Sequence, residues 1–250
     1  MTAIDINAFA GPWPYWSTKY DSPQAILELM ERHGIGAAAI VHTRAIFSDW
    51  KKGNDEALDL ATREKRFIPF ASINPADGPT EVTRSLETYH RVGVKGIRLY
   101  PQHHHYSLAS DSVAQHLLSA IGTLGFPVVL PVRVILQWGL PVMDLVAIET
   151  VVGRYPHIRF VISGTNYGET RWLFDLMRKY PNTMTEISGM QAFRAVAEAV
   201  SYVGHGRILF GAGIPIMYPA CSVAKLAVSN LNSGERKAVE SGNALRLLGI

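Results

Sequence analysis

The chain alternates short apolar segments rich in β-branched residues with longer amphipathic segments, and this pattern repeats eight times. The expected strands are residues 3–7, 37–42, 67–74, 94–100, 127–132, 158–163, 183–188 and 208–212. Residues 128–130 and 160–162 are continuous apolar runs, which is typical of parallel strands that are buried on both faces. Eight strand–helix units predict an α/β fold, a closed (β/α)8 TIM barrel.

The segments between the strands have helical periodicity and helix-end signals. The expected helices are residues 23–32, 54–64, 81–91, 112–124, 142–154, 169–179, 191–203 and 220–229, with a C-terminal extra helix at 234–247. Ser22-Pro23 is a cap followed by proline at the first helical position. An open doubly wound sheet is the alternative, but it requires a Gly-rich phosphate turn that the sequence lacks. No linker or repeat divides residues 1–250, so we expect a single domain.

Charge and composition exclude several classes of function. The formal net charge is +3 and only 18% of the residues are charged, which argues against nucleic acid as a partner and against a polybasic membrane anchor. No apolar run reaches the roughly 18 residues of a membrane span. The N-terminal segment does not resemble a signal peptide, and the single cysteine, Cys221, permits no internal disulfide. We therefore expect a cytoplasmic protein.

Both ends of the chain carry motifs of a known family. Residues 4–9 read Ile-Asp-Ile-Asn-Ala-Phe, and residues 207–215 read Arg-Ile-Leu-Phe-Gly-Ala-Gly-Ile-Pro. Together with residues 93–101, 125–131 and 158–164, these segments resemble the amidohydrolase-related ("amidohydrolase 2") family. That group of TIM barrels includes metal-dependent hydrolases and decarboxylases. The resemblance implies the same barrel and a site at the carboxyl ends of its strands.

The resemblance also implies five metal-ligand positions, and here they hold other residues. The family opens with Asp-x-His-x-His, ends its fifth and sixth strands in His, and ends its last strand with Gly-Ser-Asp-x-Pro. The corresponding residues here are Asn7, Phe9, Pro131, Ser163 or Gly164, and Gly213. A catalytic zinc needs about three nitrogen, sulfur or carboxylate ligands. We therefore expect no cofactor and no metal at this place.

Histidines elsewhere offer an alternative zinc site. His103, His104 and His105 follow the fourth strand, and His42 ends the second. Adjacent residues of one loop rarely all point at one ion, and the spacing differs from that of known zinc sites. A polar loop with one histidine facing the pocket is the favoured interpretation. His42 and His104 are then candidates for proton transfer near neutral pH.

Two arginines and one glutamate are the most informative residues at the expected barrel mouth. Arg98 and Arg133 follow neighbouring strands, so their guanidinium groups are placed to clamp a carboxylate. The alternative is that one of them pairs with Glu186 as a structural ion pair. Glu186 lies on the same strand face as Ser188, and a buried glutamate there is a candidate general acid or base.

The remaining candidates are substrate-binding residues at strand ends. They are Asn7, Trp13, Tyr100, His103, His105, Ser163, Asn166 and Tyr167. Trp13 belongs to an aromatic loop, residues 11–16, that forms either a lid over a ligand or a structural plug. Asn166 and Tyr167 either bind the substrate or cap the following helix.

These features predict an enzyme that acts on a small, anionic, carboxylated organic molecule. The expected reaction is hydrolysis of a lactone or amide, or decarboxylation, without the usual metal centre. Two alternatives stay open: a catalytically inactive member that binds a ligand or a partner protein, and a metal hydrolase with relocated histidine ligands. Barrels of this group commonly pair, so a homodimer is expected, with residues 234–247 as a contact face.

Overall fold

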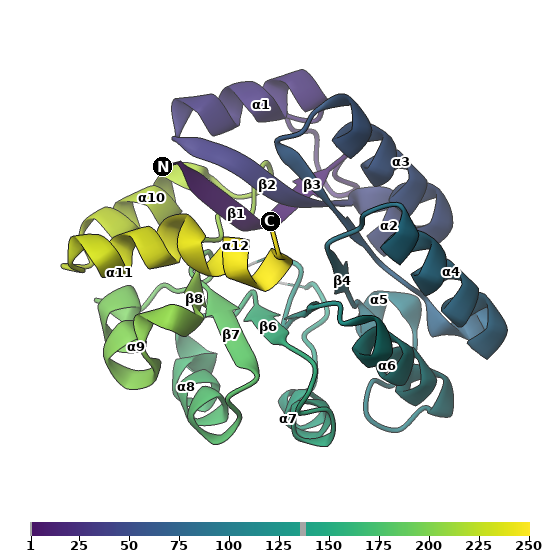
Figure 1. The fold of residues 1–250 in the computed structure, drawn as a ribbon. Coiled ribbons are helices and arrows are strands. Elements are labelled where there is room, and N and C mark those ends of the chain that lie inside the picture. The colour runs from purple at the N-terminus through teal and green to yellow at the C-terminus, as the bar shows by residue number, and fades with distance from the viewer. Residues whose placement is uncertain (1, 136–138) are drawn as a thin grey trace.

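The computed structural model describes residues 2–135 and 139–250, and eight parallel strands follow one another around the molecule in sequence order (Figure 1). The strands are β1 (Ala3–Ala10), β2 (Ile35–His42), β3 (Phe67–Ala71), β4 (Gly96–Arg98), β5 (Val128–Pro131), β6 (Phe160–Ser163), β7 (Thr183–Glu186) and β8 (Ile208–Leu209). The predicted TIM-barrel fold is confirmed.

Backbone hydrogen bonds between the first and last strand segments close the ring. The amide of Ile6 donates to the Phe210 carbonyl at 3.1 Å, and the amide of Phe9 donates to the Ile214 carbonyl at 2.7 Å. The pairing of β1 with β2 shifts register between Asp5 and Ala8. This irregularity bends β1 next to the residues that follow β8, as β-bulges do at barrel rims.

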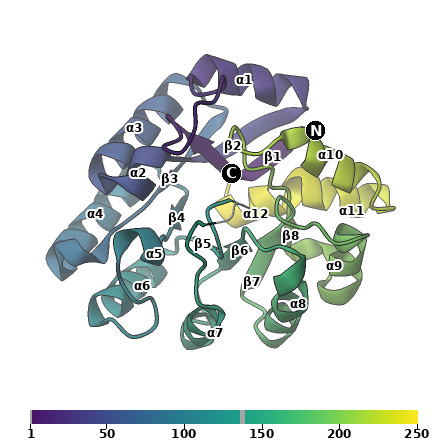
Figure 2. The same cartoon turned by 180° about the vertical axis from the view of Figure 1, so that it is seen from behind.

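Helices surround the barrel on its outside (Figures 1 and 2). They are α1 (Pro23–Arg32), α3 (Trp50–Arg63), α4 (Pro79–Arg91), α6 (Ser112–Leu124), α7 (Leu145–Arg154), α8 (Thr170–Lys179), α9 (Ala195–Val203) and α10 (Pro219–Ala227). Two short helices, α2 (Thr43–Phe47) and α5 (Pro101–His104), occupy segments expected to be irregular loops. Pro101 begins α5, a position at which proline costs no hydrogen bond.

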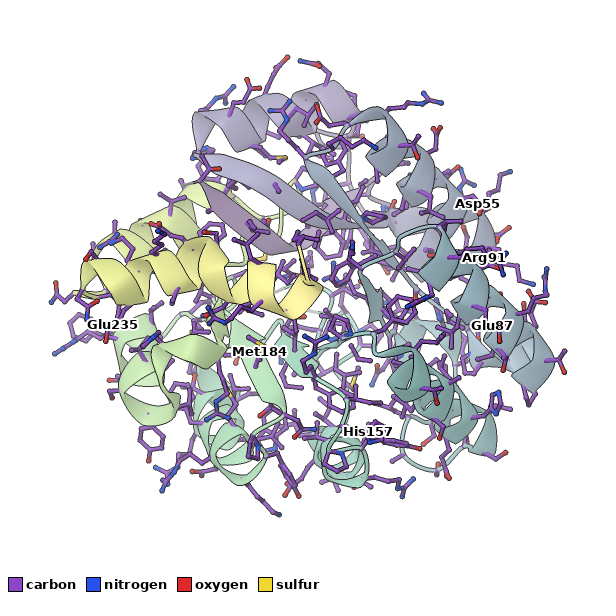
Figure 3. All side chains as sticks on the ribbon, in the orientation of Figure 1. Asp55, Glu87, Arg91, His157, Met184 and Glu235 are labelled. Atoms are coloured by element: carbon purple, nitrogen blue, oxygen red, sulfur yellow. The ribbon has the colours of Figure 1, made fainter. Side chains whose placement is uncertain are left out.

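The C-terminal segment closes one end of the barrel. α11 (Ser233–Lys237), a π-helical turn (Ala238–Gly242) and α12 (Asn243–Leu248) follow one another directly. In Figure 1, α12 lies in front of the strands near the centre of the ring. Leu247 and Leu248 pack against the barrel interior at that end, and Met184, labelled in Figure 3, is partly buried against the same cluster. The predicted extra helix is confirmed, and its apolar face packs against the barrel of the same chain.

No helix in the described ranges is both long and apolar enough to cross a lipid bilayer.

Candidate functional site

A guanidinium group lies inside the barrel near the carboxyl ends of the strands. Arg98, the last residue of β4, is fully buried. Its Nη1 donates to the Ala8 carbonyl at 3.0 Å, and its Nη2 donates to Asn7 Oδ1. The guanidinium carbon lies 4.8 Å from the centre of the Phe9 ring. The cation is therefore held by two neutral oxygens and an aromatic face rather than by a carboxylate.

Glu186 lies at the end of β7, where a network of hydrogen bonds holds its carboxylate. Oε1 accepts from the Ser188 hydroxyl at 2.8 Å and from the Gly164 amide at 3.1 Å, and Oε2 accepts from the Ser188 amide. Asn7 Nδ2 donates to Glu186 Oε1 at 3.4 Å. Asn7 thus connects Arg98 to Glu186, because its oxygen accepts from the arginine and its nitrogen donates to the carboxylate. The sequence suggested a direct ion pair between an arginine and Glu186, but in the structure Asn7 lies between Arg98 and Glu186.

Asp5 is a second buried carboxylate that the sequence analysis did not single out as a site residue. It accepts from the amides of Ala212 at 2.8 Å and Asn7 at 2.9 Å, so it joins β1 to the segment after β8. Burial raises the pKa of Asp5 to about 6. The sequence feature that could have identified Asp5 is its position between two isoleucines in an apolar strand. Such a carboxylate is expected to be buried, and buried carboxylates need specific partners.

An apolar cluster covers this polar centre at the barrel mouth. Its buried members are Phe9, Trp13, Val41, Ala45, Ile46, Tyr100, Val134 and Ile135. Trp13 is only 5% exposed, and its ring centre lies 5.3 Å from that of Phe47 and 6.1 Å from that of Phe9. Figure 2 views the end of the barrel opposite to Figure 1, with α2 and α5 beside β2 to β4. In this arrangement the Trp13 side chain packs over the mouth.

Buried polar atoms without hydrogen-bond partners concentrate at the same place. Ten such side-chain atoms occur in the described residues, and six of them belong to the mouth. These six are Trp13 Nε1, Arg98 Nε, Tyr100 Oη, His103 Nε2, His104 Nδ1 and Ser163 Oγ. Burial also raises the pKa of Tyr100 to about 12, so its hydroxyl stays a donor. Because buried polar groups are nearly always paired, this concentration marks where a polar ligand fits best.

The three loop histidines differ in environment. His103 packs edge-on against Phe47 and Tyr100, and burial lowers its pKa to about 4. His104 Nε2 lies 2.9 Å from the Ala45 carbonyl, and burial lowers its pKa as well. His105 is exposed, with a left-handed backbone at the end of α5. His103 and His104 are therefore neutral at pH 7, and they contact the Tyr100 side of the mouth.

His42 lies apart from the Arg98–Asn7–Glu186 centre. Its Nδ1 is 3.0 Å from Glu56 Oε2 and accepts from the Arg44 amide at 3.2 Å. Burial lowers its pKa. The ring lines two surface cavities of about 300 Å³ each, and neither cavity reaches Arg98 or Glu186. The structure does not bring His42 together with the other catalytic candidates.

Arg133 is engaged in an ion pair that the sequence analysis did not anticipate. Its two terminal nitrogens donate to the Glu169 carboxylate at 2.9 and 2.8 Å, and Nη1 also donates to the Gly164 carbonyl. Asn166 caps the turn that contains Glu169, while Tyr167 is 71% exposed. A joint clamp by Arg98 and Arg133 thus requires Arg133 to leave Glu169. The contacts of Asn166 are those of a helix cap, which was one of the two roles expected for it.

The residues at the family's metal positions do not form the set of ligands that zinc prefers. Asn7 Oδ1 accepts from a cationic arginine, and Phe9, Pro131 and Gly213 provide no side-chain donor. Across residues 2–135 and 139–250, no three His, Cys, Asp or Glu side chains form a group able to hold an ion. The relocated set of His42 with His103–His105 is not assembled, because His42 faces Glu56.

Solved structures with the same architecture include proteins named as decarboxylases and a hydrolase of small carboxylates. One is 2,6-dihydroxybenzoate decarboxylase complexed with 2,6-dihydroxybenzoate, at 15% identity over 99% of this chain and 98% of that chain, with a TM-score of 0.79. Another is 5-carboxyvanillate decarboxylase from Novosphingobium aromaticivorans, at 15% identity over 100% and 96%, with a TM-score of 0.76. A third is a putative 2-pyrone-4,6-dicarboxylic acid hydrolase from Pseudomonas putida, at 18% identity over 99% and 97%, with a TM-score of 0.73.

These comparisons correct the expectation that no cofactor is involved. The 5-carboxyvanillate decarboxylase was crystallised with manganese, as was a dihydroxybenzoic acid decarboxylase of the same fold from Polaromonas. The expectation was wrong because it used the ligand preferences of zinc. Manganese accepts carboxylate, carbonyl and water oxygens, so missing histidines alone do not exclude it.

A search of curated protein sequences gives no match. The amidohydrolase family model matches residues 7–250, which is nearly the whole chain and includes the segments that build the mouth. The chain therefore belongs to the amidohydrolase family.

Proposed function

We propose that the chain is an enzyme that binds a small organic carboxylate at the barrel mouth and decarboxylates it. The observation that carries the proposal is Arg98, a fully buried cation whose Nε has no hydrogen-bond partner in the described residues. A buried charge is costly unless it is paired. A substrate carboxylate supplies the missing negative charge in the geometry that a guanidinium group prefers.

The surroundings of Arg98 suit an aromatic or conjugated acid. Phe9 and Tyr100 flank the guanidinium at 4.8 and 5.9 Å from their ring centres, and Trp13 contacts Phe9. Aromatic walls with few polar groups are typical of small-molecule sites. In the proposed complex, Arg98 Nε and the Tyr100 hydroxyl donate to the substrate, because both are unpartnered donors.

Glu186 is the group proposed to move a proton. It is 1% exposed and lies one side chain away from Arg98 through Asn7. Proton transfer from a positioned carboxyl group contributes roughly 10²–10⁴-fold to a rate. In a decarboxylation, the carbon that loses CO₂ must gain one proton, and Glu186 is the group proposed to pass this proton to it.

Hydrolysis of a lactone or ester is the second candidate. The Tyr100 hydroxyl and Arg98 Nε are two unpartnered donors, and such donors polarise a carbonyl oxygen. In either reaction the substrate displaces Trp13, because this side chain is packed over the mouth.

The test compares acids with their uncharged analogues. Calorimetric titration of 2,6-dihydroxybenzoate against resorcinol, with and without added manganese, measures the contribution of the carboxylate. We expect the acid to bind at least about tenfold more tightly, and Arg98→Met to abolish that difference. Arg91→Met is the matched control, because Arg91 is exposed on the outer helix α4 (Figure 3). CO₂ release and opening of a 2-pyrone-4,6-dicarboxylate lactone report turnover.

Each outcome decides one part of the proposal. Equal binding of acid and analogue by the wild-type protein refutes a carboxylate site at Arg98. Preference for the acid without turnover, in the presence and absence of manganese, refutes catalysis and supports the alternative of a ligand-binding member. Thermal melting of each variant identifies an Arg98→Met protein that has not folded, and Arg98→Lys then serves as a second variant that keeps the charge but loses the bidentate geometry.

A further inference from the structure

A cavity of about 410 Å³ lies outside the barrel mouth, between the segment after β7 and the end of α10. Its walls come from residues 190–196 and residues 225–230. Cavities of this volume are at the lower end of the range that holds small organic molecules. None of the residues named for the Arg98 site lines it.

One wall carries a half-buried lysine. The Nζ of Lys225 donates to the carbonyls of Ile187 at 3.0 Å and Ser188 at 2.6 Å. An ammonium group has three protons, so one remains for a further acceptor. The direct contacts of Lys225 Nζ in the described part of the chain are these two neutral carbonyl oxygens, and the buried Glu186 carboxylate acts on it only through space.

The rest of the cavity is mainly apolar, and its charged lining is only basic. Met190, Ala195 and Val196 form buried surface, and each is 5% exposed or less. Phe193 and Val228 stand at the rim, and they are 87% and 76% exposed. Arg194 is the second cation of the lining, and no acidic residue belongs to it.

We propose that this cavity binds an amphipathic organic anion: a monocarboxylate with one aromatic ring or a short hydrocarbon chain. The carboxylate accepts from Lys225 Nζ, and the hydrocarbon part covers Met190, Val196 and the exposed Phe193 side chain. Charge complementarity selects this class, because an apolar pocket with two cations and no acid disfavours a cationic ligand and gives a neutral one no ionic partner.

The cavity is also connected to the proposed active site through Ser188. Its carbonyl accepts from Lys225, while its amide and hydroxyl donate to Glu186. A ligand that draws Lys225 away from Ser188 therefore acts on the residue that holds the Glu186 carboxylate. The binding proposal does not depend on the proposed reaction, because it uses different residues.

The experiment uses three probes with one hydrocarbon skeleton: 4-phenylbutyrate, 4-phenylbutanol and 4-phenylbutylamine. Methyl NMR of the whole protein reports binding at the signals of Met190, Val196 and Val228. We expect the acid to bind at least about tenfold more tightly than the alcohol, which corresponds to one charge-assisted hydrogen bond. The amine is expected to bind most weakly. The same titrations of Arg98→Met, which lacks the guanidinium group of the barrel mouth, separate the two sites.

Two variants complete the test. Lys225→Met keeps the aliphatic stem and removes the charge, so the acid and the alcohol should bind equally. Val228→Trp fills the cavity from an exposed position and should weaken all three probes, while its melting temperature stays close to that of the wild type. Equal binding of acid and alcohol to the wild-type protein, shifts confined to methyl groups elsewhere, or no binding at all would each overturn the proposal.

Discussion

The two ends of the barrel are built from the same eight strands but have opposite chemistry. At the floor, Ile6, Phe70, Val129 and Leu209 fill the interior, and α12 packs over them. At the mouth, towards which all eight strands run, the polar residues Asn7, Arg98, Glu186 and Ser163 lie under an aromatic cover. The residues of the floor contribute to packing, whereas the mouth contains buried charged groups that packing alone does not require.

This difference indicates where stability and function reside. In TIM barrels, active sites lie at the carboxyl ends of the strands, and the opposite face contributes stability. Unpartnered buried donors cost stability, so their concentration at one end is difficult to explain as structure alone. The contrast between the ends is open to direct experiment.

The largest expected effect is on the floor. Phe70→Ala removes a ring that is 1% exposed and packs inside the barrel, so we expect a loss of about 3–5 kcal/mol in unfolding free energy. Ligand binding at the mouth by the remaining folded protein should be unchanged. Urea denaturation with and without 2,6-dihydroxybenzoate measures both quantities. If Phe70→Ala has the stability of the wild type, or binds 2,6-dihydroxybenzoate with a different affinity, the two ends do not have separate roles.

The mouth should determine part of the pH dependence of stability. Burial raises the pKa of Asp5 from 3.8 to about 6, so the folded state holds a proton that the unfolded state releases between these values. The stabilising contribution is therefore complete below pH 4 and is lost as the pH rises through 6, with a change of about 3 kcal/mol. The difference in unfolding free energy between wild type and Asp5→Asn, measured from pH 4 to 7, isolates this group. A constant difference would contradict the assignment.

A smaller structural change should abolish most of the turnover at the mouth without unfolding the protein. A Cβ atom added at Gly211 would lie 2.1 Å from Glu186 Oε2, so Gly211→Ala forces the carboxylate to move. We expect a loss of about 1–3 kcal/mol in stability and a fall in turnover of at least about 100-fold. Gly206→Ala is the control, because nothing lies within 4 Å of its added Cβ. Unchanged turnover in Gly211→Ala would remove Glu186 from the proposed chemistry.

The fold was predictable from sequence because its signals are local and repeated. Apolar strands, amphipathic helices and a proline-started helix at residue 23 are each visible in a short window. The helices at 23–32 and 112–124 were predicted with their observed boundaries. The short helices α2 and α5 were missed, because a single turn of helix has little periodicity to detect.

The site was only partly predictable, because its partners are far apart in the chain. Strand-end position assigned Asn7, Arg98 and Glu186 to one face of the barrel, since parallel strands end at the same face. It could not reveal that Asn7 joins the other two, or that Glu169 occupies Arg133. Those contacts depend on side-chain directions that no local pattern records. The roles of these residues in catalysis stay predictions until the variants are measured.

The ring of strands can close only after nearly the whole chain has been synthesised. Asp5 accepts from the amide of Ala212, 207 positions later, so the ring stays open until the ribosome has released that part of the chain. During synthesis the first strand therefore presents an unpaired edge, a template for pairing with other chains. Nascent chains arrested before residue 208 should be the species most dependent on chaperones.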